Sequence, residues 1–419
     1  PVANIGEAMQ GRAAGVQVVN SGEPGSNVTF RIRGTGTINS SDPLLVIDGV
    51  PTDLSLNALN QNDVETIDIL KDASATAIYG SRGANGVILI TTKKGKSGDG
   101  TISFGANYGI QHITSVPEML NASQFASLHN EMMKNNGQAQ RPDFADPTEL
   151  GKGTDWMDAL FQTAAMQNYT ASYSGGNDKS NYYVSAGVLN QDGIIIKSSY
   201  KRYTVQMNSE TKLRPWLKLG NNLTLSHDTK RKGSFNVRET MAALPTQSIV
   251  EEDGTYSGPG SEGKWYGDLR NPIGTATINK EQTKGYNVLG NVYAEISLFD
   301  KLIFKSLGGI DFKFWDKRNF YPKYEWKPIA SPRSELYEES HKSLTYLWDN
   351  TLTYMDTFNE KHSLNLMVGS SAQNNVYNNM TASKKEFLTD SNNQLNNGLL
   401  EPLAGGTMKD WALLSFMGR

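Results

Sequence analysis

A strict alternation of apolar and polar residues, which begins at Thr101, limits the possible folds of this chain more than any other feature. Between Ile102 and Gln111 every second residue is apolar, and the residues between them are polar or glycine. The same two-residue period returns in 216–226, 288–298 and 364–372. Because successive side chains of a strand point to opposite faces, each segment predicts a strand with one apolar and one polar face.

The lengths of these strands and of their links favour a membrane barrel over a soluble sandwich. A transmembrane strand needs about ten residues, whereas strands of soluble sheets typically have about five or six. The pattern predicts about ten strands, at 101–113, 167–176, 180–189, 199–213, 215–230, 284–300, 301–316, 341–358, 361–376 and from 409 onward. Their links alternate between short turns and long stretches such as 114–166 and 231–283, with a shorter link near 190–198. Short periplasmic turns alternating with long extracellular loops are typical of outer-membrane barrels.

Composition excludes several other classes of protein. The chain has 40 basic and 43 acidic residues, a balance that gives no reason to expect a nucleic-acid partner. It has no cysteine, so disulfides and thiolate metal sites are excluded, and its five histidines lack metal-binding spacing. We therefore expect no metal site and no cofactor. The mean hydropathy of −0.48 fits a barrel as well as a soluble protein, because alternate residues face a polar lumen.

The first hundred residues follow a different pattern and predict a small α+β domain. A short helix is expected within 4–16, with Asn4 as its cap, and helical turns near 56–59 and 73–79. Strands are expected at 16–19, 28–33, 44–48, 64–70 and 87–92. The strand at 44–48 is followed by an Asp-Gly turn.

Four blocks in this region resemble the plug domain of TonB-dependent outer-membrane transporters, in the form found in the SusC/RagA branch. They are AMQGRAAGVQ at 8–17, RIRG at 31–34, LVIDGVP at 45–51 and the stretch 64–95 with its IYG and GVILITTKK segments. Each block alone is a weak signal, whereas their order and spacing together are specific.

The resemblance implies a fold class, which is a large antiparallel transmembrane β-barrel with an N-terminal α+β plug domain. The barrel of the family has about 22 strands around a plugged lumen. Residues 1–98 are then expected to form the plug, and residues 99–419 the first part of the barrel. On this interpretation the chain is a segment of a longer protein.

The resemblance also implies a function and partners. A SusC/RagA-type protein is expected to import oligosaccharides or peptides across the bacterial outer membrane and is not an enzyme. It is expected to work with a SusD-like surface lipoprotein, and a dimer of transporter–lipoprotein pairs is one expected assembly. It is also expected to bind the TonB–ExbB–ExbD complex through a TonB box upstream of Pro1. Two alternatives stay open: a siderophore- or cobalamin-type receptor without a lid, and a soluble β-rich glycan-binding protein.

Two sets of plug residues are candidates for function. The resemblance implies that the loop 35–42 points toward the substrate, and its candidate contacts are Thr35, Thr37, Asn39, Ser40, Ser41 and Asp42. An ordinary solvated turn is the alternative. A second set would hold the plug to the barrel through breakable ion pairs: Arg31, Arg33, Glu65, Asp68 and Arg82. Static surface pairs, each of little energy, are the alternative for this set.

Two further patterns concern the barrel region. Aromatic residues gather near strand ends, as expected for girdles at the membrane surfaces, although ordinary cross-strand packing would also explain each one; they are Tyr108, Tyr173, Tyr203, Trp216, Phe312, Phe314, Trp348 and Phe358. The long link 114–166 has helical spacing over 116–134 and a second helical turn at 156–161. The long links 114–166 and 231–283 are expected to dock the lipoprotein.

Overall fold

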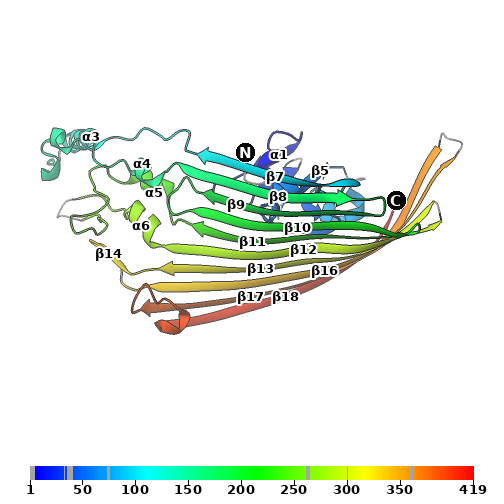
Figure 1. Cartoon of the computed structure of the whole chain (residues 1–419). Helices are drawn as coiled ribbons and strands as arrows, with labels where there is room; N and C mark the ends of the chain where they lie inside the picture. The colour runs from blue at the N-terminus through cyan, green and yellow to red at the C-terminus, as the bar shows by residue number, and fades with distance from the viewer. Residues whose placement is uncertain are drawn as a thin grey trace.

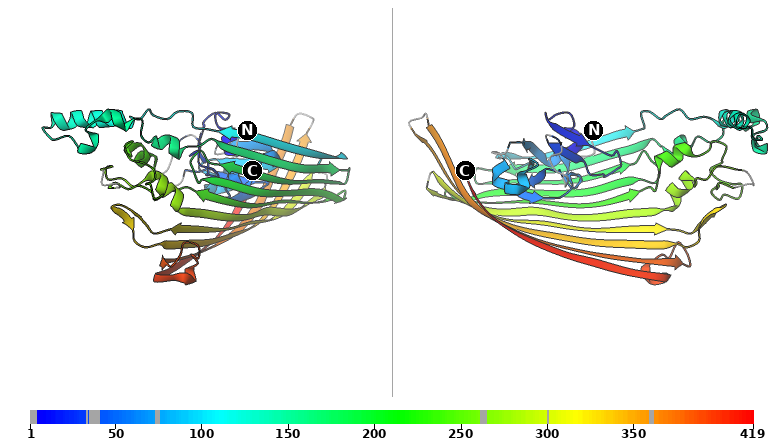
Figure 2. Two further views of the ribbon diagram at one scale, coloured as in Figure 1. Left: turned by 60° about the vertical axis from the view of Figure 1, so that its left-hand side comes forward. Right: turned by 180° about the vertical axis from the view of Figure 1, so that it is seen from behind.

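The computed structural model of the chain describes residues 5–32, 34, 41–72, 76–260, 265–299, 301–358 and 362–419. One open, curved sheet of ten strands, here called the wall, dominates the structure (Figure 1). A smaller α+β unit at 5–92, here called the plug, lies against one face of the wall (Figure 2, right). Loop helices gather at one end of the sheet, and short turns lie at the other (Figure 1).

The wall strands pair antiparallel with their neighbours in chain order, which is the up-and-down topology of outer-membrane barrels. They are β7 (Gly98–Gln111), β8 (Ala164–Gly176), β9 (Ser180–Asp192), β10 (Ser199–Arg214), β11 (Leu217–Lys232), β12 (Lys280–Phe299), β13 (Leu302–Tyr321), β16 (Glu335–Phe358), β17 (His362–Phe387) and β18 (Gly398–Gly418). The strands predicted from the alternation are confirmed.

Several strands extend further toward the long loops than the sequence indicated. β12 begins at Lys280 and β17 continues to Phe387, beyond the predicted limits of 284 and 376. The added residues of β17 are mostly polar on both faces. Outside the hydrocarbon layer neither face needs apolar side chains, so the alternation ends while the ladder of hydrogen bonds continues. The link at 317–340 also holds a small unpredicted hairpin, β14 (Tyr324–Trp326) with β15 (Ile329–Ser331).

Burial along the wall is inverted relative to a soluble sheet. In β10 the polar residues Arg202, Gln206 and Asn208 are buried, whereas Tyr203 and Met207 are 43% and 40% exposed. The buried set faces the plug, because its members bond to plug atoms. The inward face of the wall is therefore polar and the outward face apolar, as in a sheet that faces lipid.

The plug contains a four-stranded sheet in the order β4-β3-β6-β5, in which β3 and β6 are parallel, and a separate β1–β2 hairpin. Its elements are α1 (Ile5–Met9), β1 (Val16–Val19), β2 (Thr29–Ile32), β3 (Leu44–Ile47), β4 (Val50–Thr52), β5 (Val64–Leu70) and β6 (Val87–Thr92), with 3₁₀ turns η1 (Leu56–Ala58), η2 (Gln61–Asp63) and η3 (Ala77–Gly83). The five predicted strands are present.

Two details of the plug differ from the sequence prediction. The expected helix within 4–16 stops at Met9, because Gly11 and Gly15 adopt φ of 71° and 72°; its predicted cap, Asn4, lies outside the described residues. The strand β4 was not predicted. It follows a tight turn in which Asp48 and Gly49 both have positive φ, as two-residue hairpin turns require. Of the helical turn expected at 73–79, residues 73–75 lie outside the described part.

The hydrophobic core of the plug is completed by the wall. Ile47, Ile88 and Ile90 of the plug sheet are each about 1% exposed and belong to one buried cluster. The same cluster includes four inward-facing wall residues, namely Leu289, Tyr293, Leu307 and Leu347. The plug therefore packs against the wall through apolar contacts as well as polar ones.

The two long loops form a second, separate cluster at the end of the wall. They carry α3 (Ala122–Asn135), α4 (Trp156–Leu160), α5 (Val237–Ala242) and α6 (Pro272–Ile278), which confirms the helices predicted within 116–134 and 156–161. Trp156 and Leu160 pack against Ala243 and Ile273 of the other loop. Among the helices that the structure describes, none has both the length and the apolar character needed to cross a bilayer.

Candidate functional site at the plug–wall seam

The polar contacts between the plug and the inward face of the wall are here called the seam. Asp63 of the plug makes the part of the seam that contacts β9. The Asp63 carboxylate is 3% exposed and accepts hydrogen bonds from the Tyr183 hydroxyl at 2.8 Å and the Ser185 hydroxyl at 2.6 Å. Burial raises the pKa of Asp63, while these two hydroxyls and the charges of Lys93 and Arg202 oppose the shift. A buried carboxylate is costly unless it is hydrogen-bonded, so these wall hydroxyls fix the plug at this point.

A second part of the seam joins the ends of β3 and β6 to β10 and β12. The carboxylate of Asp48 accepts hydrogen bonds from the Thr92 amide at 2.9 Å and hydroxyl at 2.7 Å. The Asn208 amide group donates to the Thr92 hydroxyl and to the Lys93 carbonyl, both at 2.7 Å. On the other side, Asn291 donates to the Asp48 carbonyl at 3.0 Å. Burial raises the pKa of Asp48, and the hydrogen bonds from Thr92 counteract it.

A third part of the seam is built on the carbonyl of Asn57, in the turn η1. The Arg202 guanidinium donates to this oxygen at 2.6 Å, and the Tyr200 hydroxyl donates to it at 3.3 Å. Arg202 is 2% exposed and is the largest fully buried side chain in the described chain. Removing it would leave a buried carbonyl without its charged donor, which is expected to be costly.

Among the described residues, fewer ion pairs than hydrogen bonds join the plug to the wall. Asp53 of the plug pairs with Lys313, which also lies 3.5 Å from Asp311 of the same strand. Glu23 of the plug pairs with Lys230 at 3.5 Å, and Lys94, which follows β6, lies 4.0 Å from Glu210. The pairs Asp53–Lys313, Glu23–Lys230 and Lys94–Glu210 each link residues more than a hundred positions apart, so no local sequence signal indicates them.

Of the residues predicted to form an ionic latch, Arg82 alone reaches the wall within the described part of the chain. Its guanidinium donates to the Gln373 side chain and lies 5.8 Å from the centre of the Trp411 ring. Glu65 and Asp68 are exposed on β5, at the edge of the plug sheet, and neither forms an ion pair with a described residue. Arg31, which is half-buried on β2, also forms no ion pair with a described residue, and Arg33 lies outside the described residues. For these four the latch stays a prediction.

The predicted substrate loop is described only at its end. Thr35, Thr37, Asn39 and Ser40 lie outside the described residues, whereas Ser41 and Asp42 lead into β3. Asp42 lines a cavity of about 610 Å³ within the plug, together with Arg82, Asp53 and apolar side chains of β2 and β3. A role in substrate contact stays a prediction for this loop.

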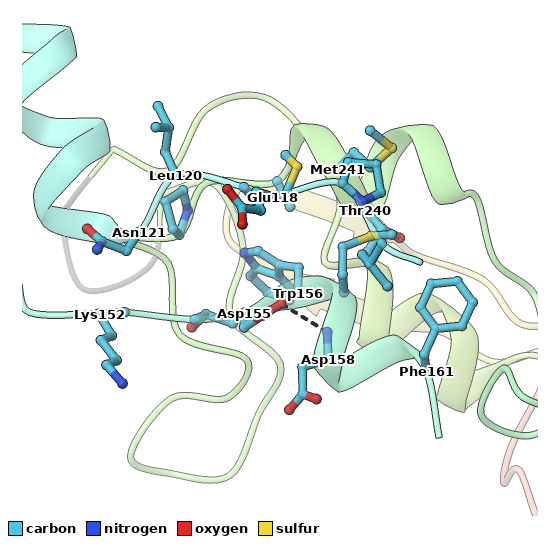
Figure 3. A pocket seen from close by; sticks show the side chains of 18 of the residues that line it. Glu118, Leu120, Asn121, Lys152, Asp155, Trp156, Asp158, Phe161, Thr240 and Met241 are labelled. Carbon is cyan, nitrogen blue, oxygen red and sulfur yellow. Dashed lines mark hydrogen bonds between the residues drawn. The ribbon is translucent and has the colours of Figure 1, made fainter. Parts of the chain in front are cut away.

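The two long loops enclose a larger hollow at the end of the wall (Figure 3). Its volume is about 910 Å³, and its lining comes from 112–125, 152–163 and 240–245. Trp156 Nε1 donates to the Leu244 carbonyl at 2.8 Å, and Asp155 caps α4 by accepting from the Asp158 amide at 2.9 Å. Within the described residues, no group of acidic or histidine side chains is arranged to hold a metal ion.

Known proteins share this arrangement of plug and wall. A family model described as the TonB-dependent Receptor Plug Domain matches residues 1–87. The TonB-dependent receptor P3 of Formosa agariphila is 33% identical over 100% of this chain and 42% of its own length. The TonB-dependent receptor SusC of Bacteroides thetaiotaomicron is 31% identical over 70% of this chain and 30% of its own length.

Among solved structures, the RagAB peptide importer in its 'open-open' state is similar in fold. The match has a TM-score of 0.86 and 28% identity, and it covers 100% of this chain and 51% of that chain. The chain thus spans about half of that chain, and between 30% and 42% of the curated relatives that it matches.

A plug seated on the polar face of an up-and-down antiparallel sheet defines the class, which is the TonB-dependent receptor of the outer membrane. Within that class, the chain belongs to the SusC/RagA family. The matched relatives are receptors and transporters rather than enzymes.

Proposed function

We propose that this chain is the plug-bearing part of an active importer that carries oligosaccharides or peptides across the outer membrane in a TonB-dependent way. The observation that carries the proposal is the seam, where hydrogen bonds outnumber ion pairs among the residues that the structure describes. A typical hydrogen bond contributes only about 0.5–1.5 kcal/mol net. A pulling force on the plug could therefore break the seam one contact at a time and open a path beside the wall.

The proposed partner on the outside is a SusD-like lipoprotein that covers the lumen. The two long loops, 114–166 and 231–283, form the surface that is proposed to bind this lipoprotein. On and beside α3, the apolar residues Leu128 and Met132 are 56% and 48% exposed, and Met119 and Leu120 are 45% exposed. Exposed apolar side chains grouped in this way are typical of protein interaction sites. On the periplasmic side, the proposed partner is the TonB–ExbB–ExbD complex.

The cargo class is open between oligosaccharide and peptide. The relative SusC and the RagAB peptide importer belong to the same family as this chain. The inward face of the wall offers many amide and hydroxyl groups, such as Asn291, Thr224 and Asn375. Such groups suit hydrogen bonding to either cargo.

Mass spectrometry of the full-length receptor, purified from native outer membranes in mild detergent, tests the proposal. A stoichiometric lipoprotein that co-purifies, with bound masses spaced by hexose units or matching peptides, is the expected result. The receptor alone with a bound metal chelate would instead support a siderophore-type receptor without a lid.

A further inference from the structure

A row of aromatic side chains crosses the outward face of the wall near its loop end. Tyr203, His227, Tyr286 and Phe314 lie directly opposite one another on the consecutive strands β10, β11, β12 and β13. Neighbouring ring centres are 6.3, 4.3 and 6.0 Å apart. The row faces away from the plug, because the alternate residues of the same strands, such as Arg202 and Asn291, bond to the plug.

Lysines flank this row on the same outward face. Lys201 Nζ lies 5.1 Å from the centre of the Tyr203 ring, and Lys342 Nζ lies 5.7 Å from that of Phe314. Lys284 is two residues from Tyr286 on the loop side. All three are exposed, and none forms an ion pair with a described residue. Asp316 lies opposite Lys284 in the register, and the two form no ion pair.

Three lysines on the inward face, in contrast, lie next to acidic side chains. Lys218 is 2.9 Å from Glu295, Lys230 is 3.5 Å from Glu23, and Lys313 pairs with Asp53. These three inward lysines thus have acidic partners, whereas the three outward lysines beside the aromatic row form no ion pair with a described residue.

The row coincides with the edge of the lipid-facing surface. From the row to the short turns, the outward residues of β10, β11, β12 and β13 include no charged side chain. The stretch of β10 from Tyr203 to Leu213 rises roughly 26 Å, at ~3.4 Å per residue and a tilt of about 40°. That rise matches the apolar band of about 25 Å in outer-membrane barrels. The aromatic row and the lysines therefore lie where lipid head groups begin.

We propose that Lys201, Lys284 and Lys342, with the aromatic row beside them, form a binding site for the phosphate groups of lipids in the loop-side leaflet. Ammonium groups bind phosphate as point charges, and aromatic rings anchor a membrane protein at head-group depth. The site would fix the height and tilt of the wall in the membrane. It rests on the outer-membrane location of the chain and not on its cargo or lid.

The test is a titration of the full-length receptor, followed by native mass spectrometry, with lipid A bearing two phosphates and with the same lipid after dephosphorylation. The key variant is K201Q/K284Q/K342Q. Each lysine near a charged lipid surface contributes about 1 kcal/mol, so the triple variant is expected to bind the phosphorylated lipid roughly a hundredfold more weakly. The charge-preserving K201R/K284R/K342R should bind as the wild type does.

A control variant, K96Q/K179Q/R214Q, removes three exposed positive charges at or near the short-turn end. Its affinity for lipid A should be unchanged. Equal binding of the two lipids by the wild type would overturn the proposal, and so would equal losses in the key and control variants. Because neither result involves a lipoprotein or a cargo, failure here is distinguishable from failure of the proposed import function.

Discussion

The wall and the plug bury opposite kinds of side chain. In the wall, polar residues such as Gln206 and Asn208 are buried, while Val292 and Trp348 are 65% and 61% exposed. In the plug, a buried apolar cluster forms the core around β3 and β6, and buried polar residues such as Asp63 and Thr92 lie where the plug meets the wall. The wall is thus ordered by its ladder of backbone hydrogen bonds, whereas the plug is ordered as a small soluble domain.

This difference predicts that the plug and the wall respond differently to mutation. The plug core is small, and four wall residues complete it: Leu289, Tyr293, Leu307 and Leu347. Small domains bury a low fraction of their surface and are marginally stable alone. We therefore expect changes in the plug core to unfold the plug while the wall stays intact.

The largest expected effect comes from Leu59→Ala. Leu59 is 2% exposed in the plug core, and such a truncation costs about 2–5 kcal/mol. Hydrogen exchange should show lost protection in β3 and β6 with β9–β11 unchanged. Leu160→Ala, in the loop cluster, is the matched control and should affect the loops and not the plug. Equal loss of protection in β9–β11 would show that plug and wall are one cooperative unit.

A charge on the outward face of the wall should have the next largest effect. Val292→Arg places a guanidinium on the lipid side of β12, at a cost of about 2–4 kcal/mol at mid-membrane depth. Asn287→Arg, on the inward face of the same strand, should cost much less. Urea unfolding in lipid vesicles, followed by tryptophan fluorescence, measures both. Similar costs for the two variants would mean that the faces are wrongly assigned.

The seam contact at Asp63 should weaken plug seating without unfolding either part. Asp63→Ala leaves the Tyr183 and Ser185 hydroxyls without their acceptor, at a cost of about 1–3 kcal/mol. The measurement is the urea concentration at which the plug is released, detected by hydrogen exchange of β6. Asp68→Ala is the control, because Asp68 is exposed and its hydrogen bond comes from Thr66 of the same strand rather than from a described wall residue. If Asp68→Ala released the plug as readily, the ionic latch would be favoured over the seam.

The smallest effect is a dependence of plug seating on pH. Burial raises the pKa of Asp63 and Asp48 in the seated plug above their ordinary value of 3.8. The seated plug therefore binds protons more tightly than a released one, so seating is favoured as pH falls toward 3.8 and weakens as pH rises through the raised pKa. Release by urea at several pH values measures this slope. Asp63→Asn should flatten it, and an unchanged slope would contradict the assignment.

The wall could be predicted from sequence because each strand carries its own two-residue period. The sequence analysis did not predict the extension of β17 to Phe387 or the β14–β15 hairpin. The alternation of apolar and polar residues disappears where both faces of a strand are exposed to water. The seam could not be predicted, since Asp63 and Ser185 are 122 positions apart. Sequence reasoning selected Glu65 and Asp68 for their charge, whereas burial in the fold falls on Asp63, at the end of a 3₁₀ turn.

A reversible lock between plug and wall tests most directly the claim that the plug must leave its seat for import. Val50 of β4 is 1% exposed, and a Cβ at Gly309 of β13 would lie 3.2 Å from its Cγ2 atom. Since the chain has no cysteine, V50C/G309C in the full-length receptor introduces a single pair.

Uptake of the cargo identified by mass spectrometry would be followed in cells that carry this receptor as their sole importer of it. We predict that uptake stops when the disulfide forms and returns on reduction, while each single-cysteine variant imports normally. Full uptake with the disulfide quantitatively formed would contradict the account.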